Sequence, residues 1–188
     1  MGVCCYFSQI SDSDIMSIIE NPKRVELLLN DGEYFEEPKG NILQIILSKI
    51  FKKKADNWMP ESFNAYYDID KMWHPIHFVL TGSPFEGNFP LNFIAYGGIE
   101  VGKDNGYGAL RVLYSNEVKE LKNELDKISI ENFKEKLNIA DLNKNDIYPK
   151  NDRWDNEILN NVIEEYENLK YFINDSFSKN KGIYISIS

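Results

Sequence analysis

Cysteine is scarce in this sequence. The chain holds only Cys4 and Cys5, which are neighbours. Adjacent cysteines rarely bond to each other, because the bond strains the peptide between them. We therefore expect no disulfide framework within the chain, which is typical of a protein in a reducing compartment. The sequence also lacks a basic segment followed by an apolar run, so no signal peptide is expected.

The sequence also has fewer basic than acidic residues, and it has no long apolar run. Lys and Arg number 21 against 30 Asp and Glu, which gives a formal net charge of −9 and a pI near 4.8. Neutralising phosphates requires clustered Lys and Arg, so we expect no nucleic-acid partner. No apolar stretch approaches the roughly 18 residues of a membrane span, so we expect no membrane partner. The composition predicts a soluble, cytoplasmic protein.

Apolar and aromatic residues are present in ordinary amounts. They make up 43% and 13% of 188 residues, which is enough for a sizeable core. This length is typical of one domain, and we expect a single domain over residues 1–188.

Short apolar runs at the two ends of the chain predict strands. "VCCYF" over 3–7 and the alternating "IYISIS" over 183–188 are typical of strands that are too short to be stable alone. We expect both strands to lie in one sheet and to pair. "ALRVLY", residues 109–114, predicts a further strand.

Helical spacing dominates the sequence between these strands. It predicts helices over 11–21, 22–29, 41–54, 115–128 and 129–137, with Ser11, Ser115 and Ser129 as N-caps. Residues 55–67 and 141–149 are expected to be irregular. The longest helical pattern runs from Trp154 to Phe177. Together these elements predict an α+β fold: a small mixed or antiparallel sheet that includes both termini, packed with several helices and a long C-terminal helix.

The segment "DIDKMWHPIHFVLTG", residues 68–82, contains both histidines of the chain. His74 and His77 are three residues apart, but Pro75 suits the first turn of a helix and would place His74 outside at the cap. Two ligands without a third make a poor metal site, so we expect no metal and no cofactor. The main interpretation is that Trp73 and His77 are buried, with His77 hydrogen-bonded.

Two functional interpretations of this segment stay open beside the core interpretation. Asp70 could orient His77 as an acid–base pair in a small enzyme, although no nucleophile motif accompanies them. Alternatively, Trp73, His77, Thr81 and Tyr148 line a pocket for a small ligand without chemistry.

Several motifs occur in an order that resembles a known family. They are Met1-Gly2 with Tyr6; Asp70, Trp73, His77-Phe78 and Leu80-Thr81-Gly82; Gly106-Tyr107-Gly108 followed by Glu117-Val118; and Ile147-Tyr148-Pro149 followed by Trp154. This set resembles the YfbM-like family of small bacterial proteins of unknown function. The resemblance covers nearly the whole chain and implies a single α+β domain. It supplies no activity, cofactor or catalytic residue.

An acidic face on the long C-terminal helix gives the leading functional hypothesis. Glu157, Glu164 and Glu167 lie outside the apolar stripe of that helix. Clustered carboxylates speed the encounter with a basic partner. We therefore expect a non-catalytic binding protein whose partner is a basic protein, such as a toxin for which this chain is the antidote.

Overall fold

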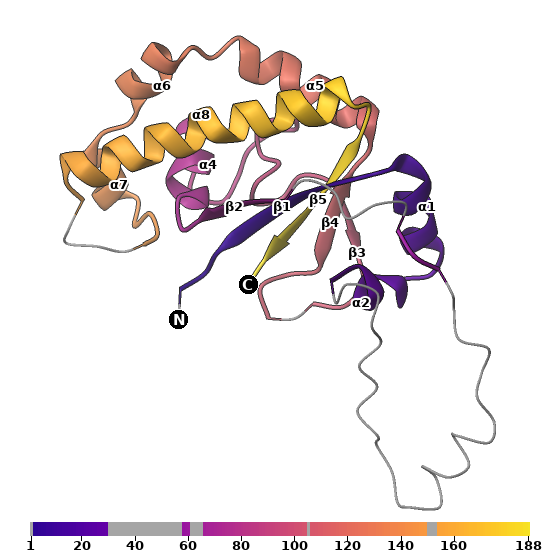
Figure 1. Ribbon diagram of the computed structural model, residues 1–188. Helices are drawn as coiled ribbons and strands as arrows, with labels where there is room; N and C mark the ends of the chain where they lie inside the picture. The colour runs from indigo at the N-terminus through magenta and orange to yellow at the C-terminus, as the bar shows by residue number, and fades with distance from the viewer. Residues whose placement is uncertain (1, 30–57, 61–65, 105, 150–153) are drawn as a thin grey trace, which may run out of the picture.

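The two ends of the chain lie side by side in one sheet (Figure 1). In this computed structural model, which describes residues 2–29, 58–60, 66–104, 106–149 and 154–188, β1 (Cys5–Ile10) pairs antiparallel with β5 (Gly182–Ile187). The pairing extends past both strands, because the Cys4 N–H donates to the Ser188 carbonyl and the Ser188 N–H donates to that of Cys4, over 2.7 and 3.0 Å. The predicted pairing of the terminal strands is confirmed.

Five strands form this sheet in the order β2-β1-β5-β4-β3, and every neighbouring pair is antiparallel. The remaining strands are β2 (Tyr66–Asp70), β3 (Ile99–Val101) and β4 (Leu110–Leu113). The predicted α+β fold and the strand within 109–114 are confirmed. β2 begins in a segment expected to be irregular, because an edge strand with one fully buried residue, Ile69, carries little apolar pattern.

One face of the sheet carries the main core. It is covered by α4 (Trp73–Thr81), α5 (Ser115–Asp126) and α8 (Asn156–Ser178), and Figure 1 shows α8 running across the sheet. α6 (Ile130–Lys136) packs on α8, where the ring of Phe133 stacks on that of Tyr166 with centroids 3.9 Å apart. The long C-terminal helix is therefore confirmed, and its apolar stripe is buried as predicted.

The other face of the sheet carries a smaller apolar cluster. Ile10 and Val112 of the strands meet Ile15 and Ile18 of α1 (Asp12–Glu20) and Val25 of α2 (Arg24–Leu29) there. This face belongs to the same domain, since the strands contribute side chains to both clusters.

The N-caps are partly as predicted. The Ser11 and Ser129 side chains accept from the N–H groups of Asp14 and Asn132, as expected of caps. Ser115 is instead the first residue of α5, and its hydroxyl donates to Asp12 over 2.7 Å. The Ser115 hydroxyl, which the sequence pattern predicts as a helix cap, is therefore used in a tertiary hydrogen bond to α1.

The segment 141–149 was wrongly expected to be irregular. α7 (Ile139–Lys144) occupies its first half, with Asn138 as its cap. The helix buries only Leu142, so it has no apolar stripe that a sequence pattern could show. The predicted helix over 41–54 lies outside the described residues. No helix in the described part of the chain is long and apolar enough to cross a membrane.

Candidate functional site

The histidine segment folds as the end of β2, a turn and α4. Asp70 ends β2 with a positive φ of 47°, and α4 begins at Trp73. Pro75 lies in the first turn, where its missing N–H has no intrahelical partner to lose. The prediction that His74 lies outside the helix is wrong, because Met72 takes the cap position and His74 is the second helical residue.

His74 is a neutral, hydrogen-bonded residue of the core. Its Nδ1 accepts from the backbone N–H of Tyr148 over 2.8 Å. The proton of the neutral ring therefore lies on Nε2, which is 2.9 Å from the Pro84 carbonyl. Burial lowers the pKa of His74 and favours this neutral form.

Trp73 and Tyr148 hold the segment that precedes β1. The indole Nε1 of Trp73 donates to the Val3 carbonyl over 3.0 Å, and the Tyr148 hydroxyl accepts from the Val3 N–H over 2.8 Å. The two rings stack with centroids 6.3 Å apart. Trp73 is buried, as predicted, with 8% of its surface exposed.

His77 is fully buried, but the prediction that it is hydrogen-bonded is wrong. Neither ring nitrogen has a hydrogen-bond partner among the described residues, and the ring lies edge-on to Tyr96. Seven of the nine α4 residues are buried, and His77 is one of them. Burial lowers the pKa of His77 to about 4; His74 and Arg111 act in the same direction, and the backbone of Glu86 opposes them.

Asp70 and His77 do not form the acid–base pair that the sequence left open. The Asp70 carboxylate is exposed and accepts from the thiol of Cys4 over 3.0 Å, which raises the pKa of that thiol. His77 makes no hydrogen bond to Asp70. Each residue therefore has a separate environment.

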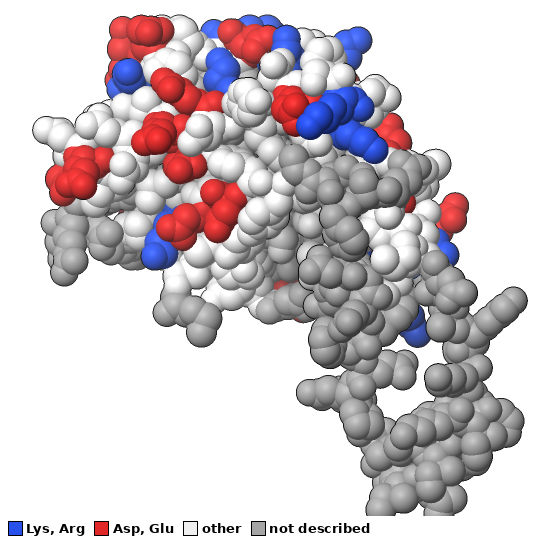
Figure 2. Space-filling view, in the orientation of Figure 1, with Lys and Arg blue, Asp and Glu red and all other residues white. Residues whose placement is uncertain are grey.

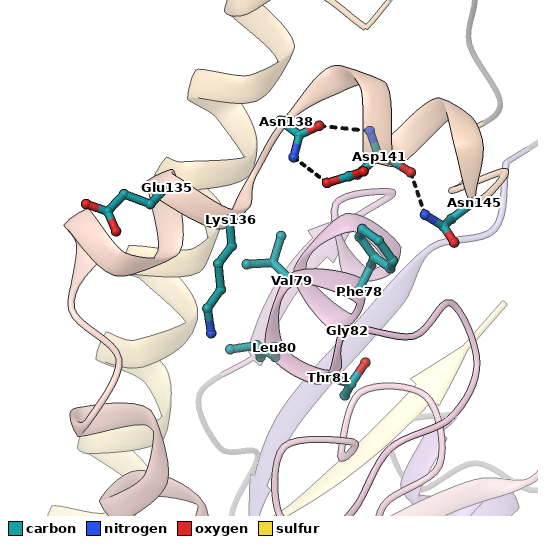
Figure 3. A pocket seen from close by; sticks show the side chains of 10 residues that line it. All are labelled: Phe78, Val79, Leu80, Thr81, Gly82, Glu135, Lys136, Asn138, Asp141 and Asn145. Carbon is teal, nitrogen blue, oxygen red and sulfur yellow. Dashed lines mark hydrogen bonds between the residues drawn. The ribbon is translucent and has the colours of Figure 1, made fainter.

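Thr81 lines an open pocket of about 570 Å³ at the C-terminal end of α4 (Figure 3). The apolar part of its wall comes from Phe78, Val79 and Leu80, and the polar part from α6, α7 and the residues around them. The complete lining is Phe78, Val79, Leu80, Thr81, Gly82, Glu135, Lys136, Asn138, Asp141 and Asn145.

Three polar residues of this pocket, Asn138, Asp141 and Asn145, bond to one another. Asn138 accepts from the Asp141 N–H and donates to its carboxylate, and Asn145 donates to the Asp141 carbonyl. Thr81 donates to the His77 carbonyl over 2.8 Å. These bonds shape the ends of α4 and α7, while the charged side chains of Glu135 and Lys136 complete the polar wall.

Trp73 belongs to a second pocket, of about 240 Å³, which the sequence did not indicate. Aromatic side chains and one buried arginine line it together with smaller residues: Val3, Trp73, Phe85, Ala95, Tyr96, Glu100, Tyr107, Gly108, Ala109, Arg111 and Ile187. The predicted pocket residues are therefore divided: Trp73 lies here, Thr81 lies in the other pocket, and His77 and Tyr148 line neither. The sequence feature that could have indicated this pocket is the single arginine, Arg111, within the apolar run 109–114.

The acidic face of α8 lies on the surface. Glu157, Glu164 and Glu167 are exposed, and Figure 2 shows carboxylates along the line of α8. Figure 2 also shows lysine and arginine atoms where the C-terminal end of this helix lies. Within the described ranges, no three His, Cys, Asp or Glu residues come together in a way that could hold a metal ion.

Comparison with known proteins defines the family. The family model for DUF1877, a domain of unknown function, matches residues 1–186. The chain belongs to the DUF1877 family. No curated protein matches it significantly.

A solved structure is similar in fold to this DUF1877 chain. It is the crystal structure of YfbM from Escherichia coli, a protein of unknown function, which is 18% identical to this chain with a TM-score of 0.65. The match covers 98% of this chain and 99% of that one. The resemblance to the YfbM-like family is thus confirmed, and it concerns the fold alone.

Proposed function

We propose that this DUF1877 protein is a non-catalytic, cytoplasmic binding protein that captures a basic protein partner through α8. The observation that carries the proposal is the set of Glu157, Glu164 and Glu167. All three are exposed, and within the described part of the chain none of them makes an ion pair. Carboxylates that make no ion pair with the described residues are available to an outside cation.

Helix geometry supports one continuous surface. At about 100° per residue, Glu164 lies roughly 20° and Glu167 roughly 80° around the helix from Glu157. Tyr171 falls between these two angles and is 75% exposed. The resulting strip, defined as Glu157, Glu164, Glu167 and Tyr171, spans about 21 Å at 1.5 Å per residue. Tyrosine is enriched among residues that dominate binding energy, so Tyr171 would supply apolar contact within a charged surface.

The other charged side chains of α8 make hydrogen bonds within the protein, which distinguishes them from the carboxylates of the strip. Lys170 donates to the carbonyls of Leu125 and Ile128, both over 2.9 Å. Glu165 accepts from the hydroxyl of Tyr67 on β2, and Asp175 accepts from Lys179 over 2.7 Å. The carboxylates that hold the fold are thus different from those of the strip.

The test is capture of partners from the native host at low salt. Reversing Glu157, Glu164 and Glu167 to Lys should abolish recovery of basic proteins while keeping the fold, since exposed charges contribute little to stability. A matched control reverses Glu20, Glu26 and Glu120, which are exposed on α1, α2 and α5 and change the net charge equally. The control should recover the same partners as the wild type.

A recovered partner allows a kinetic test as well. Its association rate should fall as salt rises, because the screening length is about 8 Å at physiological ionic strength. His77→Gln should leave capture unchanged. Equal recovery by wild type and the α8 triple reversal would refute the proposal.

A further inference from the structure

A pocket of about 240 Å³ lies where the N-terminal end of α4 meets β3, β4 and the end of β5. Aromatic rings form much of its wall. Phe85, Tyr96 and Tyr107 are each more than half exposed, whereas Trp73 is 8% exposed. Apolar rings gathered around a cavity and left in water are typical of a binding site rather than of a packed surface.

A buried guanidinium forms the polar part of this wall. Arg111 is 6% exposed. Its Nη1 donates to the carbonyls of Phe93 and Gly97, over 2.8 and 3.1 Å, and its Nη2 donates to that of Ile94. These bonds use three of the five N–H donors of an arginine. The Nε donor and the second Nη2 donor have no acceptor among the described residues.

Arg111 makes no salt bridge in the described part of the chain. Burial lowers the pKa of Arg111, and the Cys5, Glu100 and Tyr96 side chains oppose this effect; Glu100 is opposite Arg111 in the β3–β4 pairing, but it is exposed. A buried cation whose hydrogen bonds all go to neutral carbonyls keeps much of its desolvation cost. Anchoring the 93–97 turn accounts for three donors of Arg111. It accounts for neither the two remaining donors nor the aromatic wall.

We propose that this pocket binds a small aromatic monocarboxylate. The carboxylate would accept from the free donors of Arg111, a charge-assisted contact that arginine makes especially well. The ring would pack against Trp73 and the side chains of Tyr96 and Tyr107.

The size and charge of the pocket limit this ligand. Its volume equals that of about eight waters at about 30 Å³ each, so it suits one ring or two fused rings. The rim carboxylate of Glu100 disfavours a second negative charge. This site is separate from the α8 strip, and the proposal stands independently of the proposed function.

Binding of two matched probes to the whole chain tests the proposal. Indole-3-carboxylate carries the ring and the charge, and indole-3-carboxamide carries the same ring without the charge. In calorimetry, the carboxylate should bind at least ten-fold more tightly than the amide. No binding by the carboxylate, or equal affinities for the two probes, would overturn the proposal.

Substitutions locate the binding. Ala109→Leu puts a larger side chain into the cavity, and Tyr96→Ala removes part of the aromatic wall; each should weaken carboxylate binding at least ten-fold. Tyr66→Ala, which removes an exposed tyrosine of β2 outside the pocket, should bind as the wild type does. Arg111 is left unchanged because it also anchors the 93–97 turn.

Thermal unfolding confirms that each variant is folded. Tyr96 is 56% exposed, so Tyr96→Ala keeps the test valid even where Ala109→Leu disturbs the core. Wild-type affinity for the carboxylate in folded Tyr96→Ala would overturn the proposal.

Discussion

The backbone N–H of Tyr148 donates to Nδ1 of His74 over 2.8 Å, which ties α4 to the turn after α7, 74 residues away. The same ring contacts the Pro84 carbonyl through Nε2 over 2.9 Å. One imidazole thus satisfies a donor and an acceptor from two separate loops. His74 therefore has a structural role, because it links α4 to both loops.

Replacing His74 tests the contribution of these two hydrogen bonds to stability. His74→Leu leaves the Tyr148 N–H and the Pro84 carbonyl without a partner, and an unsatisfied buried group costs about 1–3 kcal/mol. We expect a loss of roughly 2 kcal/mol in the free energy of unfolding, measured by urea denaturation. His74→Asn keeps a short acceptor and should cost less. Equal losses in both variants would contradict the assigned hydrogen bond.

Acid should destabilise the protein through His77. Its pKa is lowered to about 4 in the folded state, against about 6.5 when unfolded, so the unfolded chain binds more protons between these values. The contribution of neutral His77 to the free energy of unfolding is fully present well above pH 6.5 and is lost as the pH falls toward 4. We expect a loss of about 2 kcal/mol from this group between pH 7.5 and 5.

His77→Leu provides the control for this pH effect. It removes the titrating ring and its two unpaired nitrogens, so the free energy of unfolding should depend less on pH by about 2 kcal/mol. Urea denaturation at pH 7.5 and pH 5 measures the difference. The same pH dependence in wild type and variant would show that His77 is not the responsible group.

Trp73 should be a large single contribution to stability. Trp73→Ala removes a buried ring and the hydrogen bond to the Val3 carbonyl, and we expect a cost of roughly 3–5 kcal/mol. Trp73→Phe keeps a ring and should cost clearly less. Denaturation of the two variants tests this, and a cost below about 1 kcal/mol for Trp73→Ala would contradict the packing described.

Removing residues 183–188 should unfold the protein. β5 lies in the middle of the sheet between β1 and β4, and Ile183 and Ile185 are fully buried. Each such side chain contributes roughly 1.5–3 kcal/mol, and the lost strand pairing adds to this, against a usual total stability of about 5–15 kcal/mol. Circular dichroism should show loss of cooperative unfolding. Deletion of Ser188 alone should leave a folded protein.

The spacing of apolar residues predicted the elements in which that spacing continues over many residues, and capping residues predicted where some helices begin. The helix of residues 156–178 and its buried Val162, Tyr166 and Leu169 follow from helical spacing alone. Ser11 and Ser129 were correct as caps because capping involves only the next few residues. Pattern failed for α7 and β2, since each buries only one residue fully.

The amino-acid pattern was sufficient to predict the α+β class, the terminal strands, the long helix with its exposed carboxylates, and the burial of Trp73 and His77. Periodicity and composition act within a few residues, so these features are written locally. The contacts of each side chain follow from the three-dimensional fold. It separated Asp70 from His77, gave His74 two hydrogen bonds, and gave His77 none with the residues that the structure describes. It also brought Arg111 to a wall shared with Trp73, because these contacts join residues tens of positions apart.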